Sequence, residues 1–200
     1  DGGLTWQKPG NVFYPGGDMV GSVPFAVSIG TSPNVAGLAY AWIQTRAGRG
    51  AQVGARSLDG GVTWQVVEHL CLVDWILVTP DPNVVYTAQR RKTSILQSHI
   101  SGDSATCTPL AELPAEITSL AMSSDGHDLW AGTVGGLYRS RDQGATWQSP
   151  DQHPSSREWR ALAVNPRDPS MLFGLDQDGK FWLYRDSDVA PVRSPSQVPG

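Results

Sequence analysis

Arginine is the residue type in this chain that is best suited to bind a ligand. Twelve of the 15 basic residues are arginines, although the formal net charge of the 200-residue chain is −4. A planar guanidinium donates paired hydrogen bonds to carboxylate, phosphate or sulfate groups, and it also stacks on rings. Seven basic residues fall in three short stretches: Arg46, Arg49, Arg90, Arg91, Lys92, Arg157 and Arg160. They form either an anion or partner site, or solvated loop tips in which Arg157 pairs with a neighbouring acid.

Catalysis by carboxylates would require two acids that face one cleft. The chain has four glutamates, none of which has a tyrosine nearby in the sequence: Glu68, Glu112, Glu116 and Glu158. Asp74 and Glu158 are the candidates for such a pair, because both precede predicted inner strands. Acids at that position also serve as structural caps. The sequence therefore favours a protein without catalytic activity and, if it is an enzyme, a glycoside hydrolase.

The sequence lacks the common metal and cofactor motifs. Its 4 histidines show no His-x-His or His-Glu-x-x-His spacing, and no glycine-rich loop precedes a helix. Residues 176–179 (DQDG) resemble the start of a calcium loop but lack the later acidic ligand, so they predict a hairpin turn. We predict no metal and no cofactor. Cys71 and Cys107 lack Cys-x-x-Cys spacing and either form one disulfide or remain two buried thiols.

Composition favours an all-β domain. The chain contains 22 Gly, 15 Pro and 8 Trp but only 4 Glu and 3 Lys, which favours short strands and tight turns over long helices. No apolar run approaches the ~20 residues of a membrane helix, so we expect no membrane span. The acidic net charge disfavours nucleic-acid binding. The chain has no signal peptide and starts inside a repeat, which suggests a mature or trimmed portion of an extracytoplasmic or secreted protein.

An eight-residue pattern supplies the elements that must position these side chains. Residues 57–64 (SLDGGVTW) have a second copy at 140–147 (SRDQGATW), and a truncated copy at 1–6 (DGGLTW). An Asp can accept hydrogen bonds from the amides of a tight turn, Gly can take positive φ, and Thr-Trp restarts a strand. Trp64 and Trp147 are two periods of 41.5 residues apart, which places a worn copy at 101–106. This period is that of a four-stranded propeller blade.

The period predicts a β-propeller of about four four-stranded antiparallel blades at residues 1–188, or a sector of a larger ring, followed by a Pro-rich tail at 189–200. The fourth blade lacks an octet, so residues 4–7 are predicted either to close that blade or to be the remnant of a preceding one. The predicted strands are 23–29, 35–43, 51–57 and 62–67; 74–79, 84–89, 94–98 and 106–111; 117–122, 129–133, 136–140 and 145–148; and 160–164, 171–175 and 180–185.

The octet resembles the Asp-box, or BNR, repeat of β-propellers such as sialidases, sortilin-type receptors, xyloglucanases and Ycf48-type photosystem II assembly factors. This resemblance implies that each octet closes the hairpin between the third and outermost strands of a blade, away from the usual binding face. The repeat is specific for fold and not for function. The Arg-Ile-Pro motif of sialidases does not occur here. The resemblance implies structural roles for Asp59, Gly61, Trp64, Asp103, Asp142, Gly144 and Trp147.

On a propeller, the loops between second and third strands share one face with the loops that join successive blades. This arrangement predicts that the basic stretches gather on that face, with Trp75 and Trp159 near the mouth of the central channel. We therefore predict a non-catalytic binding or assembly module with a protein partner or an anionic ligand. The alternative is a carbohydrate-active domain, either glycosidase-like or glycan-binding. The predicted binding residues are Arg46, Arg49, Arg90, Arg91, Lys92, Arg157, Trp159 and Arg160.

Overall fold

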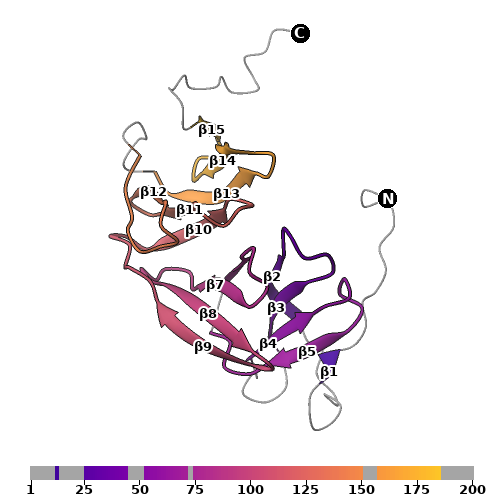
Figure 1. Ribbon diagram of the computed structural model, residues 1–200. Helices are drawn as coiled ribbons and strands as arrows, with labels where there is room; N and C mark the ends of the chain where they lie inside the picture. Colours follow the sequence, from indigo (N-terminus) through magenta and orange to yellow (C-terminus); the bar gives the residue numbers. More distant parts are fainter. Residues whose placement is uncertain (1–11, 14–24, 45–51, 72–73, 151–156, 186–200) are drawn as a thin grey trace.

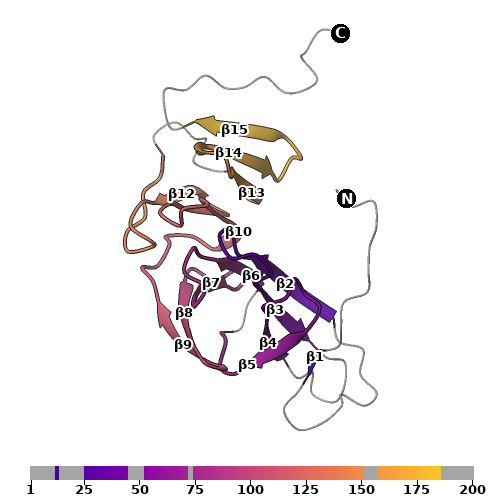
Figure 2. The ribbon, with the colours of Figure 1, turned by 45° about the vertical axis from the view of Figure 1, so that its right-hand side comes forward.

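Four β-sheets follow one another along an arc in chain order (Figures 1 and 2). The computed structural model describes residues 12–13, 25–44, 52–71, 74–150 and 157–185. Within these ranges there are 15 strands and no helix. The predicted closing strand at residues 4–7 and the predicted tail at 189–200 lie outside the described residues.

Sheet 1 has the order β1-β5-β4-β3-β2, and sheet 2 has the order β6-β7-β8-β9. Sheet 3 contains β10-β11-β12, and sheet 4 contains β13-β14-β15. The strands are β1 (Val12–Phe13), β2 (Phe25–Thr31), β3 (Ala39–Gln44), β4 (Gln52–Ser57), β5 (Trp64–Val67), β6 (Trp75–Val78), β7 (Val84–Ala88), β8 (Ile95–Ser101), β9 (Ser104–Pro109), β10 (Ile117–Met122), β11 (Leu129–Thr133), β12 (Gly136–Ser140), β13 (Trp159–Asn165), β14 (Asp168–Asp176) and β15 (Phe181–Arg185).

Strands β2–β5, β6–β9, β10–β12 and β13–β15 each form an antiparallel meander, and the first strands of successive meanders lie against one another: β2 against β6, β6 against β10, and β10 against β13. This is the radial arrangement that the repeat period predicts. Two details differ from the prediction. The expected strand at residues 145–148 is only an isolated bridge between Arg139 and Gln148. In sheet 1, β1 adds a parallel partner to β5, which the sequence pattern did not indicate.

Large side chains fill the space between consecutive sheets. Tyr40 and Trp42 of β3 pack with Val78 and Val85 of sheet 2 in one buried cluster. Trp130 packs with Trp159 in the cluster between sheets 3 and 4. Glycine at position 132 permits sheets 3 and 4 to approach closely, because a Cβ at that position would lie only 2.6 Å from Cβ of Trp159. Each sheet therefore buries a face on its neighbour that it could not bury alone.

The octet at residues 57–64 forms a closed turn between β4 and β5. The Ser57 hydroxyl donates to Asp59 Oδ1 at 2.9 Å and accepts from the Gly61 amide at 2.8 Å. The Asp59 carboxylate accepts from the Thr63 amide at 2.9 Å and from the Thr63 hydroxyl at 2.6 Å. Gly61 has φ 90°, a conformation that L side chains rarely adopt. The indole of Trp64 donates to the Gly61 carbonyl at 3.0 Å.

The octet at residues 140–147 repeats these contacts after β12, the third strand of sheet 3. Ser140 donates to Asp142 at 2.7 Å, and Asp142 accepts from the Thr146 amide at 2.9 Å and the Thr146 hydroxyl at 2.6 Å. Gly144 again has φ 90°. The indole differs in its partner, since Trp147 donates to the Ala111 carbonyl at 3.1 Å, beyond the end of sheet 2. The turn of sheet 3 is thus fixed to the preceding sheet.

The worn copy at residues 101–106 forms a different turn. Ser101 pairs directly with Ser104, so the hairpin from β8 to β9 closes over Gly102 and Asp103 alone. The carboxylate of Asp103 is exposed and lies 3.6 Å from Arg56 Nη2 of sheet 1. Without the octet's Gly and Trp, the chain adopts the shorter hairpin, and Asp103 joins two sheets instead of holding its own turn.

The seam between sheets 1 and 2 also contains a disulfide, which joins Cys71 to Cys107 of β9 with a Cα–Cα distance of 6.4 Å. Beside it, the Glu68 amide donates to the Asp103 carbonyl at 2.7 Å, and the Ala105 amide donates to the Glu68 carbonyl at 2.8 Å. Of the two alternatives that the sequence left open for the cysteines, the structure has the paired one. The cross-link ties the segment after β5 to the outer strand of the next sheet.

Hydrogen bonds lower the pKa of both turn carboxyls. The Thr63 hydroxyl, followed by the Thr63 amide and the Ser57 hydroxyl, lowers the pKa of Asp59 to about 2. The Thr146 hydroxyl and the Ser140 hydroxyl lower the pKa of Asp142 to about 2 in the same way. An unfolded Asp titrates near pH ~3.9. The stabilisation by each ionised turn is therefore complete above about pH 5 and is lost as the pH falls through the folded pKa.

This linkage predicts the pH dependence of an Asp142→Asn variant. The variant should melt at a lower temperature than the unchanged protein at neutral pH, because it lacks the charged acceptor in the turn. The difference in Tm should shrink as the pH falls from about 5 towards 2, where the unchanged carboxyl becomes protonated too. Thermal unfolding followed by circular dichroism at several pH values measures both curves. A Tm difference that stays constant over this range would contradict the proposed charge on the turn.

Candidate anion-binding site

A cavity of about 370 Å³ opens where the inner strands of sheets 3 and 4 begin. The loop from β7 to β8 supplies Arg90 and Arg91, and the start of β13 supplies Glu158 and Arg160. Thr118 of β10 and Val134 of the turn from β11 to β12 complete the lining. Three arginines and one glutamate therefore line a single cavity, so its lining residues carry a net positive charge although the chain is acidic overall.

Backbone contacts fix the loop that carries Arg90 and Arg91. The Arg90 amide donates to Asp74 Oδ2 at 2.6 Å, and the Arg91 amide donates to the Ile117 carbonyl at 3.1 Å. Arg91 has φ 59°, an uncommon backbone conformation for a residue other than glycine. The Arg90 guanidinium lies 5.5 Å from the centre of the Trp75 ring, within range of a cation–π interaction. The loop thus presents its cations from a defined backbone.

Trp159, the first residue of β13, lies between Glu158 and Arg160 in the sequence. Its side chain is 1% exposed, and its carbonyl accepts hydrogen bonds from the hydroxyls of Thr118 at 2.7 Å and Ser119 at 2.8 Å. Trp159 is buried, whereas Glu158 before it and Arg160 after it both line the cavity, and the pairing of β13 with β14 shifts register between Trp159 and Ala161, where Arg160 lies. The prediction that Trp159 itself contacts a ligand is therefore wrong, since its ring fills the core.

Arg157 is also turned away from the cavity lining. Its Nη1 lies 2.8 Å from Asp176 Oδ2 and 3.5 Å from Asp178 Oδ2, and its guanidinium lies 5.0 Å from the centre of the Trp182 ring. This is the paired alternative that the sequence left open. Although burial raises the pKa of Asp176, hydrogen bonds from the Lys180 amide, the Trp182 indole and Arg157 hold it below its usual value. Arg157 thus neutralises a buried acid.

The other predicted site residues have separate positions. Lys92 is exposed in the same loop as Arg90, but it does not line the cavity. Asp74 caps the Arg90 amide, so the structure gives it the structural role that the sequence held open for strand-entry acids. Glu158 is the one carboxylate among the lining residues. Arg46 and Arg49 lie outside the described residues. The sequence analysis did not predict Thr118 and Val134 as cavity-lining residues. The only sequence signal for them is their position near the start of β10 and just after the end of β11, at the same edge of sheet 3.

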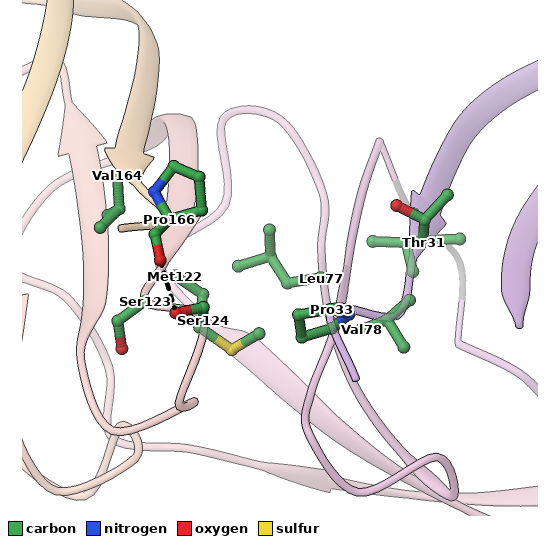
Figure 3. Close-up of a pocket in the computed structure, with 11 residues that line it drawn as sticks. Thr31, Pro33, Leu77, Val78, Met122, Ser123, Ser124, Val164 and Pro166 are labelled. Carbon is green, nitrogen blue, oxygen red and sulfur yellow. Dashed lines mark hydrogen bonds between the residues drawn. The ribbon is translucent and has the colours of Figure 1, made fainter. Parts of the chain in front are cut away.

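A second cavity of about 270 Å³ lies at the opposite ends of the inner strands, where β2, β6, β10 and β13 finish. Figure 3 shows Leu77, Val78, Met122 and Val164 around it. The Ser124 hydroxyl donates to the Pro166 carbonyl at 3.2 Å, so two of the polar groups that line this cavity already bond to each other. The two ends of the inner strands therefore differ in character: one is lined by charged groups and the other is mainly apolar.

Among the described residues, no cluster of three or more His, Cys, Asp or Glu side chains could hold a metal ion. In the same part of the chain, no helix is long and apolar enough to cross a membrane.

The cavity at the start of the inner strands of sheets 3 and 4 is lined by arginines, whose guanidinium groups are suited to bind an anion.

Comparison with solved structures shows a β-propeller fold. The GH74 enzyme of Niastella koreensis matches with a TM-score of 0.66 and 14% identity, over 86% of this chain and 30% of that chain. YCF48 from Cyanidioschyzon merolae matches with a TM-score of 0.60 and 16% identity, over 82% of this chain and 52% of that chain. No protein-family model and no curated protein matches the sequence. The predicted all-β propeller is thereby confirmed, and this chain spans about a third and about half of these two proteins.

The different environments of Arg157 and Arg160 predict different effects of their removal. Arg157→Ala should lower the free energy of unfolding by about 1–3 kcal/mol, because it leaves the fully buried Asp176 without its cationic donor. Arg160→Ala should change that free energy by less than about 0.5 kcal/mol, since Arg160 is exposed and has no ion pair among the described residues. Urea denaturation of both variants tests this. Equal losses would contradict the assignment of Arg157 as structural.

Proposed function

We propose that this protein is a non-catalytic binding or assembly propeller that binds an anionic group of a protein partner at the cavity lined by Arg90, Arg91 and Arg160. The observation that carries the proposal is that three arginines, from sheets 2 and 4, line one cavity. Among the described residues, Arg91 and Arg160 have no carboxylate within ion-pair distance. A carboxylate, phosphate or sulfate would satisfy donors that the chain itself leaves to solvent.

The repeat assignment supports the same interpretation. We propose that the octets at 57–64 and 140–147 are Asp-box repeats, on the basis of their matching sequence and their matching turn contacts. Residues 1–188 would then be one propeller domain. The disulfide between Cys71 and Cys107 supports an extracytoplasmic or secreted location, since disulfides persist in oxidising compartments.

A carbohydrate-active domain is the second candidate, because Glu158 lines the cavity beside three donors and because one structural neighbour is a GH74 enzyme. Hydrolysis of a glycoside by the usual route needs two carboxyl groups about 5–10 Å apart across the bond that is cleaved. Asp74, the other predicted member of the pair, accepts the Arg90 amide and is not among the cavity-lining residues. Binding without hydrolysis therefore has more support.

Anion binding can be measured by NMR titration with sulfate and with a short acidic peptide that has a free C-terminal carboxylate. At low ionic strength, the amide signals of Thr118 and Val134 should shift and saturate with either probe, because both residues line the cavity. The double variant Arg91→Glu with Arg160→Glu should weaken binding by at least about tenfold, which corresponds to about 1.4 kcal/mol.

The double variant Arg167→Glu with Arg185→Glu is the matched control, because it changes the net charge by the same amount at exposed residues that do not line the cavity. Arg167 is exposed in the turn from β13 to β14, at the opposite end of the strand from Arg160. This variant should bind both probes as the unchanged protein does. Equal weakening in the control would mean that only net charge matters, and unchanged binding in the double variant would exclude the cavity. Hydrolysis of aryl glycosides that is lost in Glu158→Gln would favour the carbohydrate-active alternative instead.

A further inference from the structure

The charged residues that line the anion cavity are of two kinds. Arg90, Arg91 and Arg160 can only donate hydrogen bonds, because a guanidinium has five N–H donors and no acceptor. Glu158 is the one acid of the lining, and an ionised carboxylate can only accept. Three arginines and one glutamate give the lining residues a formal charge of +2. A dianion would neutralise this charge, but it would share the cavity with a carboxylate.

The hydroxyl of Thr118 is a second acceptor. Thr118 lines the same cavity, and its hydroxyl donates its one hydrogen to the Trp159 carbonyl at 2.7 Å. Only the lone pairs of the hydroxyl oxygen remain for a ligand. The polar groups of the lining are therefore three cationic donors and two acceptors. A ligand that satisfies all of them must accept hydrogen bonds and also donate at least one.

The carboxylate of Glu158 has no partner within the described part of the chain. The backbone carbonyl of Glu158 accepts from the Gln177 amide at 2.9 Å, so the main chain of this residue is bonded to the end of β14. Its side chain has neither an ion pair nor a hydrogen bond to any described residue. Such a carboxylate is stabilised by a ligand that donates to it, and it repels an anion that has no hydrogen to donate.

Three small oxyanions differ in this one property. At about pH 8, sulfate, methyl phosphate and hydrogen phosphate are all tetrahedral dianions, because a phosphate monoester loses its second proton near pH ~6. Sulfate and methyl phosphate then have no acidic hydrogen, whereas hydrogen phosphate keeps one. Hydrogen phosphate can thus accept from arginines through three oxygens and donate through the fourth. The cavity, with a volume of about 370 Å³, has room for any of the three.

We propose that this cavity binds hydrogen phosphate in preference to sulfate and phosphate esters, and that Glu158 is the residue that determines the preference. The Glu158 carboxylate accepts the hydrogen that the ligand retains, while the arginines donate to its other oxygens. A site that hydrogen-bonds a ligand hydroxyl discriminates against an analogue without that group, because its own polar group is then left unpaired. This preference rests on the proposed function, since both require the arginines to bind an anion. Free phosphate would then compete with the anionic group of a protein partner.

NMR titration with sulfate, methyl phosphate and inorganic phosphate, at about pH 8 and constant ionic strength, tests the preference. The methyl signals of Thr118 and Val134 report binding, because both residues line the cavity. The Kd of inorganic phosphate should be at least about tenfold lower than the Kd of either other anion. In Glu158→Gln this ratio should fall to about one, since a glutamine amide can also donate to an anion that has no hydrogen. Loss of one charge by itself affects equal dianions alike, so the ratio isolates the hydrogen bond. Sulfate binding that persists in this variant verifies that the cavity is intact.

Glu116→Gln is the matched control. The Glu116 carbonyl accepts from the Val134 amide at 3.0 Å, but Glu116 does not line the cavity. This variant removes the same charge close to the site and should keep the preference for phosphate. Equal affinity for the three anions, methyl phosphate that binds as tightly as inorganic phosphate, or a preference that survives Glu158→Gln or disappears in Glu116→Gln would each overturn the role of Glu158, while anion binding by the arginines would stand. If no anion saturates either methyl signal, the proposed function fails together with the preference.

Discussion

The structure depends on the close approach of each sheet to the next. Sheets of three to five strands are too small to bury both faces by themselves, so stability requires a neighbour. Between sheets 3 and 4 the approach is possible because position 132 has no Cβ, and because the Trp159 carbonyl that comes near it receives two hydroxyl donors. A buried carbonyl without donors would cost free energy at this contact. Packing and hydrogen bonding are therefore satisfied at the same residue.

This contact also positions the candidate site. The side chain of Trp159 is held between the sheets, whereas the residues on either side of it, Glu158 and Arg160, line the cavity with Thr118, whose hydroxyl is one of the two donors to Trp159. The loop that carries Arg90 and Arg91 is joined to β10 by the hydrogen bond from the Arg91 amide to the Ile117 carbonyl. The cavity is thus assembled by the same contacts that hold sheets 2, 3 and 4 together.

Sequence alone was most informative where the contacts are local. The octet turns join residues no more than four positions apart, so residue type and spacing were enough to place Asp59 and Asp142. Trp159 was misplaced because its environment depends on the register between distant strands, which a pattern of aromatic residues does not reveal. The same limit applies to residues 145–148. A Thr-Trp pair favours a strand, but Trp147 bonds to Ala111 of the preceding segment, and only one bridge to Arg139 forms.

Some arginines of this chain are paired with a carboxylate and others line the cavity, and this difference determines which of them could bind an anion. Arg139 is held by Asp128 through two hydrogen bonds, at 3.2 Å and 2.9 Å, and Arg157 is held by Asp176. Both have a countercharge, with Arg139 buried and Arg157 partly buried. Arg91 and Arg160 line one cavity and have no such partner among the described residues. Like charges that share a cavity repel one another, and a bound anion would remove that cost while using the same fork geometry that Asp128 uses on Arg139.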